Sequence, residues 1–410
     1  MERFEGLNFI LRSARWAAWA LLFCLLAAAD ASAANKDYCV HVDYSAVPSL
    51  VNDRKLTLLV NVGNCASVSV TADGSPVPAT YNSSTGMALF TTTGSALVVT
   101  AVNWTSGGTG AATKATLYNN YHWAYSLTFD DNRQTQYTNG KPVLDAHGWR
   151  AAVAVVGSWA NAGGYWMTWT TLQSLRAAGW DILNHSYDHP NPITCANLTN
   201  ELSQNQTLLQ TYFPSYHVSQ FVFPYENSSA STCGGFPPSY LISSECGGGS
   251  YNYVDNPLAF QAQRGGLFGT DDTAWKSLAA SAAGNSRPTW LVEYTHSVAA
   301  GSAAAEDAYS TNAATLGDLL NYLDNNYGAS GNKSLWFAPA GEVRDYLFTR
   351  DDSVVTTCAV VTPTPTLTPS RTPTPAATAT GTATKTASPT ASMTRTPTAT
   401  LSPTPTPSLT

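Results

Sequence analysis

The sequence predicts a small antiparallel β-sandwich followed by an α/β domain, in which helices wrap a largely parallel sheet. Two observations lead to this fold class. Between residues 35 and 118, alternating hydrophobic runs such as LTLLVNV and ALVVTAV are separated by Gly, Asn, Asp and Pro turns. From residue 119 to 358, buried-type strands such as AYSLTFDD alternate with helical patterns such as LTNELSQNQTLLQTY.

The composition excludes some partners. The chain has 410 residues, of which 44% are hydrophobic, so it can build more than one real core. Only 11% of the residues are charged and the formal net charge is -7. Proteins that bind polyanions usually carry a basic face, so we expect no nucleic-acid partner and favour neutral or weakly charged ligands.

Residues 1–34 are typical of a signal peptide. Arg12 and Arg15 precede an apolar run, which is followed by the small residues Ala31-Ser32-Ala33. The run is shorter than the ~20 residues that span a bilayer. We therefore expect cleavage after Ala33 or Ala34, no membrane span afterwards, and a secreted or extracellular protein. An uncleaved membrane anchor is the alternative.

Residues 359–410 are rich in Pro, Thr, Ser and Ala, with no aromatic or acidic residue. Such a segment cannot bury enough apolar area to offset the entropy of ordering, so we expect an extended, disordered linker. Two interpretations stay open: the polypeptide was cut short, or the tail is a stalk that associates the protein with a cell wall or cell surface.

Disulfides are expected in an exported chain. Loss of Cys24 with the signal leaves six of the seven cysteines, at positions 39, 65, 195, 233, 246 and 358. Proximity favours Cys39 with Cys65 and Cys233 with Cys246, which leaves Cys195 for Cys358. The chain has no C-x-x-C pair, so a thiolate zinc site is disfavoured.

Two histidines and two carboxylates are candidates for a metal site. His185 and His189 are four residues apart, so one helical turn would place both rings on one side. A hydrolytic metal needs a third protein ligand and an open position for water. Asp130 and Asp131 end an apolar strand pattern, where one can bind the metal and the other can accept a proton. A solvated turn is the alternative.

The order of these pieces resembles the polysaccharide deacetylase superfamily, also called carbohydrate esterase family four, from residue 126 to about 350. The family's T-F-D-D stands here at residues 128–131, and its H-[ST]-x-x-H stands at residues 185–189. The third motif, R-x-P-aromatic, appears as V-F-P-Y at residues 222–225, and the last, a strand ending in His, appears at residues 291–296.

The resemblance implies a distorted (β/α) barrel that removes acetyl groups, N- or O-linked, from an acetylated polysaccharide. It implies a divalent metal, with Zn²⁺ first and Co²⁺ or Ni²⁺ as alternatives. The metal ligands would be Asp131, His185 and His189. Asp130 would be the general base and His296 the general acid, and the backbone N–H of Tyr225 would face the oxyanion.

The chain departs from the family pattern at one position. Val222 stands where many members have the arginine that orients the base, and Arg264 is a candidate replacement. Trp159 and Trp166 follow a predicted strand and are candidates for stacking against a sugar, because large aromatic rings suit that contact.

Two other functions remain alternatives. Two His and one carboxylate is also the arrangement of non-haem Fe(II) oxygenases, but Asp188 follows the first His by three residues rather than the usual two. The missing arginine also fits a degenerate, non-catalytic domain that only binds glycans at a cell surface.

Overall fold

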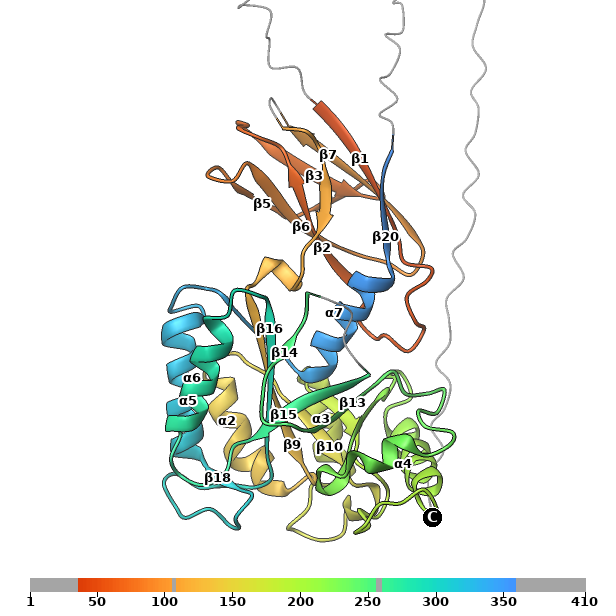
Figure 1. Cartoon of the computed structure of the whole chain (residues 1–410), viewed down its shortest axis with the longest axis vertical. Helices are drawn as coiled ribbons and strands as arrows, with labels where there is room; N and C mark the ends of the chain where they lie inside the picture. The colour runs from red at the N-terminus through yellow and green to blue at the C-terminus, as the bar shows by residue number, and fades with distance from the viewer. Residues whose placement is uncertain (1–35, 105–107, 256–259, 359–410) are drawn as a thin grey trace, which may run out of the picture. The chain divides into compact units, whose positions relative to one another are not determined.

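The computed structural model describes residues 36–104, 108–255 and 260–358 (Figure 1). The predicted signal peptide and the predicted Pro/Thr tail lie outside these residues. Within the described ranges, none of the helices combines the length and the apolar character needed to cross a membrane.

Seven parallel strands close into a barrel, which confirms the predicted barrel. The seventh strand pairs with the first, so the sheet has no free edge at that point. In pairing order the strands are β9 (Trp123–Asp130), β10 (Ala152–Val155), β11 (Asp181–Asn184), β12 (Gln220–Val222), β13 (Ser243–Gly247), β15 (Gln261–Gly266) and β16 (Thr289–Thr295).

The barrel is distorted around β9. One side of β9 pairs with β16 along residues 123–129. The other side is divided, because its first half pairs with β19 (Leu335–Phe337) and its second half pairs with β10. A further strand, β14 (Asn252–Tyr253), adds antiparallel to β16. Every residue of β9 and β16 is buried, as expected for strands that are covered on both faces.

Helices cover the outside of the barrel (Figure 1). The helix α6 buries Leu316, Leu319, Leu320 and Leu323, a spacing that places four leucines on one stripe. The predicted helical pattern LTNELSQNQTLLQTY is confirmed as α4. The α-helices are α2 (Lys141–Asp145), α3 (Trp169–Ala177), α4 (Leu198–Tyr212), α5 (Thr273–Ala283), α6 (Ala313–Tyr327) and α7 (Ala340–Asp352).

Short elements fill the loops between these strands and helices. The 3₁₀ turns are η1 (Tyr118–Asn120), η3 (Gly157–Trp159), η4 (Pro224–Glu226) and η5 (Ser228–Thr232), and η2 (Gln136–Gly140) is a π-helical turn. The strands β17 (Val298–Ala299) and β18 (Thr311–Asn312) pair with each other in parallel.

The remaining strands form the predicted sandwich around a core of alternating residues such as Val42, Leu58, Phe90 and Val102. One sheet has the order β20 (Val354–Cys358), β1 (Lys36–Asp43), β7 (Leu97–Trp104), β3 (Val68–Ala72), β4 (Ser75–Val77). The other has the order β5 (Ala79–Asn82), β6 (Met87–Thr93), β2 (Lys55–Asn61), β8 (Ala112–Lys114). The strand β20 follows the barrel in sequence, yet it pairs antiparallel with β1.

The helix α7 links the barrel to β20 and is tied to the sandwich by polar contacts. The Asp345 carboxylate accepts hydrogen bonds from the backbone N–H groups of Asn52 and Asp53, at 2.9 and 3.0 Å. Glu342 accepts from the Lys55 ammonium at 2.6 Å. These contacts join side chains of α7 to the segment that enters β2.

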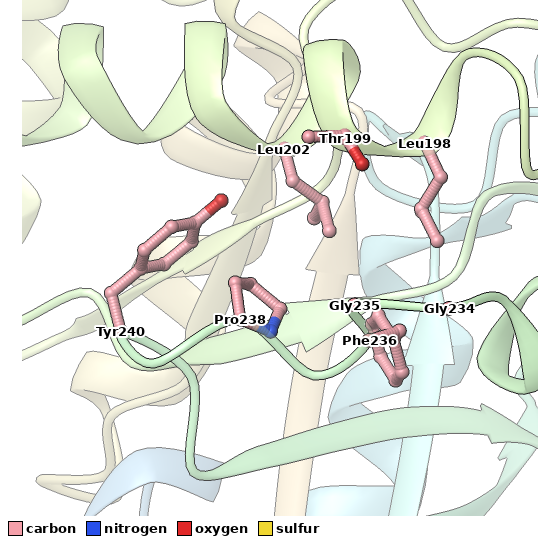
Figure 2. A pocket seen from close by; sticks show the side chains of 8 residues that line it. All are labelled: Leu198, Thr199, Leu202, Gly234, Gly235, Phe236, Pro238 and Tyr240. Atoms are coloured by element: carbon pink, nitrogen blue, oxygen red, sulfur yellow. The ribbon is translucent and has the colours of Figure 1, made fainter.

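The predicted cysteine pairing is wrong. Cys195 bonds to Cys233, while Cys65 and Cys246 are free and buried. The disulfide joins the segment before α4 to the segment after η5. Beside it, α4 and residues 234–240 enclose a hollow of about 30 Å³, lined by Leu198, Leu202, Phe236 and Tyr240 among others (Figure 2). That volume suits one or two waters, so we regard it as packing space.

Candidate metal centre and active site

The acid pair lies where β9 ends. The backbone turns sharply here, because Asp131 and Asn132 adopt the left-handed conformation, with φ of 74° and 44°. The Asn132 side chain accepts a hydrogen bond from the backbone N–H of Val156. The Gln136 amide donates to the backbone carbonyls of Asp130 and His296, at 2.5 and 2.8 Å. The ends of β9, β10 and β16 are therefore fastened together at this point.

His185 and His189 come from the loop after β11, and they do not form the helical turn that their spacing allowed. Ser186 and His189 instead have positive φ values of 69° and 53°, which fold the loop so that both rings meet. The His185 Nδ1–H donates to the backbone carbonyl of Val222 at 2.8 Å. This bond places the hydrogen on Nδ1 and leaves the Nε2 lone pair free to bind a metal.

Three ligand atoms converge beside the end of β9. The two Nε2 atoms are 3.2 Å apart, and each lies 3.6 Å from Oδ1 of Asp131. A tetrahedral ion with bonds of ~2.1 Å would need separations of about 3.4 Å. Oδ1 of Asp131 is also buried without a hydrogen-bond partner among the described residues. The three residues therefore fit a divalent ion with nitrogen and oxygen ligands.

Electrostatics keep His189 ready to bind a metal. Burial and the neighbouring His185 lower the pKa of His189 to about 4, although Asp131 and Asp130 oppose this shift. The imidazole is therefore neutral at pH 7. A neutral ring is the form that binds a metal ion.

Asp130 is held in the charged form. Burial raises the pKa of this carboxyl, but the Arg264 guanidinium and the nearby histidines outweigh burial and lower it to about 2. Arg264 Nη1 and Nη2 donate to Oδ1 and Oδ2 of Asp130, at 2.9 and 2.7 Å. Arg264 therefore supplies the cation expected in place of the motif arginine. Because only 1% of Arg264 is exposed, it holds Asp130 rather than a substrate.

Two acids that sequence reasoning missed surround Arg264. Glu226 accepts from Arg264 Nη2 at 2.5 Å, and Glu245 lies 3.9 Å from Nη1. The Tyr294 ring lies under the guanidinium, 3.8 Å from its central carbon. Glu226 directly follows the expected oxyanion residue, but its side-chain contact depends on the turn at η4 and has no sequence signature.

His296 lies near Oδ2 of Asp131, whereas His185 and His189 lie near Oδ1. Its Nε2 lies 3.8 Å from Oδ2 of Asp131. Its Nδ1–H donates to the backbone carbonyl of Tyr309 at 2.9 Å, which leaves Nε2 facing the centre. The closure of β16 onto β9 brings these distant parts of the sequence together.

The aromatic candidates lie on the rim. Tyr225 has a φ of 56° and is 56% exposed, and its ring centre lies 4.5 Å from that of His189. Trp159 stacks on Trp166 at 4.4 Å and lies 5.2 Å from the His189 ring. Both tryptophans are half-buried, so one edge of each is accessible. Asp188 is exposed and bonds to Ser158 instead of joining the metal ligands.

Residues 122–234 match the family model described as polysaccharide deacetylase. This segment belongs to the polysaccharide deacetylase family. The matched segment contains the acid pair, His185, His189 and Tyr225. Arg264 and His296 lie beyond it.

Several solved structures are similar to part of this chain. The Xyl-CE4 domain of a multidomain xylanase from the hindgut metagenome of Trinervitermes trinervoides is 16% identical, with 54% of this chain and 88% of that chain covered and a TM-score of 0.34. The peptidoglycan deacetylase PdaC from Bacillus subtilis is 15% identical, with 54% and 90% covered and a TM-score of 0.34.

A third similar structure is a family 4 carbohydrate esterase from Streptomyces lividans in complex with acetate. It is 15% identical, with 52% of this chain and 91% of that chain covered and a TM-score of 0.32. No curated protein matches the chain. At these TM-scores the family assignment rests on the matched segment and the fold on the strand pairing.

Proposed function

We propose that this protein is a metal-dependent hydrolase that removes acetyl groups, N- or O-linked, from a polysaccharide. The observation that carries the proposal is the convergence of Asp131, His185 and His189. Asp130 lies 3.9 Å from His185, and His296 lies 3.8 Å from Asp131. Zn²⁺ is our first choice of metal because the donors are two imidazoles and one carboxylate.

A divalent ion bound at this centre supplies a Lewis acid and lowers the pKa of water. Asp130 accepts the proton of the attacking water, because its low pKa keeps it ionised and Arg264 fixes its orientation. Attack on the acetyl carbonyl creates a tetrahedral oxyanion, and the Tyr225 backbone N–H donates to it. His296 protonates the leaving amine or alcohol, and acetate and the deacetylated sugar leave.

The degenerate glycan-binding alternative loses its motivation. It arose because Val222 occupies the place of the motif arginine, but Arg264 supplies a guanidinium to both oxygens of Asp130. The order of the ligands disfavours the oxygenase alternative, because the converging carboxylate is Asp131, which precedes both histidines, and not an acid two residues after the first histidine. We therefore propose catalysis rather than binding alone.

Release of acetate is the direct test. Purified protein is loaded with Zn²⁺ and incubated with acetylated xylan, chitin oligomers and peptidoglycan, with and without chelator. We expect acetate from at least one substrate, loss of acetate with chelator or in His185→Ala, and full activity in His217→Ala, an exposed histidine away from the centre. Glycan retention without acetate from any substrate would favour the binding-only alternative.

We further propose that the protein acts outside the cell. The charged and apolar pattern of residues 1–34 and the Cys195–Cys233 disulfide support this, because disulfides persist in oxidising compartments. Attachment to a cell wall through residues 359–410 is part of the same proposal. Mass spectrometry of the exported protein would test it, with a new N-terminus at residue 34 or 35 expected.

A further inference from the structure

Arg133 links Asp131 to Asp307, which lies in the loop that follows β17, and we call this linked pair of Arg133 and Asp307 the strap. Arg133 lies two residues after Asp131 and donates from Nη2 to Oδ2 of Asp131 at 3.1 Å. Its other terminal nitrogen, Nη1, donates to Asp307 at 2.5 Å and to the Ser297 hydroxyl at 3.1 Å. The Arg133 side chain is mostly buried, with 12% of it exposed. One guanidinium therefore contacts both Asp131, a proposed metal ligand, and Asp307 in a loop that is distant in the sequence.

Asp307 in turn fixes the turn that holds His296. Oδ1 of Asp307 accepts from the Tyr309 backbone N–H at 2.8 Å and from the Ser310 hydroxyl at 2.7 Å. The carbonyl of Tyr309 then accepts both the backbone N–H and the ring Nδ1–H of His296, at 3.1 and 2.9 Å. The orientation of the His296 ring thus depends on where Asp307 holds residue 309.

We propose that Arg133 and Asp307 are positioning residues that hold His296 at a fixed place relative to Asp131. This inference rests on the proposed function, because it assigns His296 the role of general acid. Arg133 also occupies Oδ2 of Asp131, so the carboxylate presents only Oδ1 to an ion. A cation beside a metal site repels the metal, so Arg133 does not serve to strengthen metal binding.

The test combines substitutions at both ends of the strap with removal of His296. Arg133→Met keeps the length of the side chain and removes the charge. Asp307→Asn keeps an acceptor for Tyr309 and replaces the acceptor for Arg133 with a donor. Each is measured in the wild-type and the His296→Ala backgrounds, as kcat on an acetamide substrate of the Zn²⁺-loaded protein. Arg287→Met, in an exposed ion pair with Asp255, is the matched control.

A positioned general acid contributes roughly 10²- to 10⁴-fold, so we expect each strap variant to lose roughly 10- to 100-fold in kcat. In the His296→Ala background the same substitutions should cost no more than about 2-fold, because the group they position is gone. Equal losses in both backgrounds would overturn the inference. Undiminished activity of His296→Ala itself would overturn the acid assignment of the proposed function, and the inference with it.

Zn²⁺ affinity, measured by competition with a chromophoric chelator, provides a readout that is independent of activity. Arg133→Met should bind Zn²⁺ at least as tightly as wild type while kcat falls. Weaker binding in proportion to the loss of kcat would instead mean that Arg133 supports the metal ligands, and would overturn the inference. If Arg133→Met does not fold, Asp307→Asn tests the strap from its other end.

Discussion

Arg264 of β15 donates one hydrogen bond to each carboxylate oxygen of Asp130 at the end of β9, and both side chains are buried. Because both side chains are buried, each needs the other as its partner, and they meet only when the barrel closes. The same guanidinium also bonds to Glu226, the neighbour of Tyr225. Arg264 therefore orients the proposed base and anchors the turn that presents the proposed oxyanion donor.

Replacing Arg264 should cost both stability and activity. In Arg264→Met, Asp130 and Glu226 lose their cation in a buried site, and removal of one partner of a buried pair costs about 3–5 kcal/mol of unfolding free energy. Urea denaturation would measure this loss. Arg264→Lys keeps the charge but not the two-pronged geometry, so it should recover part of the stability and little of kcat. Wild-type kcat in Arg264→Met would contradict the role in orienting Asp130.

Substitutions of Tyr225 can separate the role of its backbone N–H from the role of its side chain. Its positive φ costs a non-glycine residue energy, and glycine accepts that conformation and keeps the N–H. Tyr225→Gly should therefore retain kcat within a few-fold and raise KM if the exposed ring contacts sugar. An ester in place of the Tyr225 amide, introduced with the α-hydroxy analogue of tyrosine, removes the N–H without fixing φ as proline would. Loss of one oxyanion donor costs roughly 10²- to 10³-fold in kcat. Circular dichroism checks that both variants fold, and equal kcat in the two would contradict the backbone role.

Glu293 should make stability depend on pH. Burial raises its pKa from 4.5 to about 8, and the hydrogen bond from Tyr125 only partly opposes this. The group is neutral in the fold and ionised in the unfolded chain between these values. Its contribution is fully present below about pH 4.5 and is lost as pH rises toward 8.

Glu293→Gln imitates the neutral form, so it should make the unfolding free energy depend less on pH in this range. The difference in unfolding free energy between variant and wild type should grow by a few kcal/mol from pH 5 to pH 8, on the order expected from 1.36 kcal/mol per pKa unit. Glu245 and Asp181 also have raised pKa values, but their contributions cancel in the comparison. A difference that does not change with pH would contradict the assignment.

The disulfide should stabilise the fold, and its pairing can be checked directly. Cys195 and Cys233 are separated by 38 positions, and a loop of that size corresponds to about 4 kcal/mol in the chain-entropy model. Cys195→Ser should lower the unfolding free energy by that order. Cys65→Ser is the control, because it keeps the same bridge as oxidised wild type. Peptide mapping that joins Cys233 to Cys246 would contradict the structure.

The local patterns could be predicted because residues that are close in the sequence determine them. The acid pair follows directly from a buried strand, and the two histidines share one loop, so sequence spacing was enough to group them. Arg264 could be proposed because Val222 stands where the resemblance calls for an arginine. Its actual partner geometry required barrel closure, which brings β15 and β9 to the same interior.

Other contacts carried no signal in the sequence. Asp307 lies in an unremarkable loop, and only the folded turn brings its carboxylate to Arg133. The cysteine prediction failed because it ranked pairs by sequence proximity. The loops that follow β11 and β12 are neighbours in space, so Cys195 meets Cys233 while Cys246 remains buried within β13.

The pairing of β20 with β1 makes the sandwich a discontinuous domain. During synthesis, β1 emerges early, but its neighbour on one side is translated only after the whole barrel. Until then the edge of β1 exposes unpaired backbone groups that can recruit other chains. A recombinant fragment that stops at residue 118 would lack β20 and would leave that edge of β1 open. We therefore expect the isolated sandwich to aggregate and a chain of residues 36–358 to stay soluble.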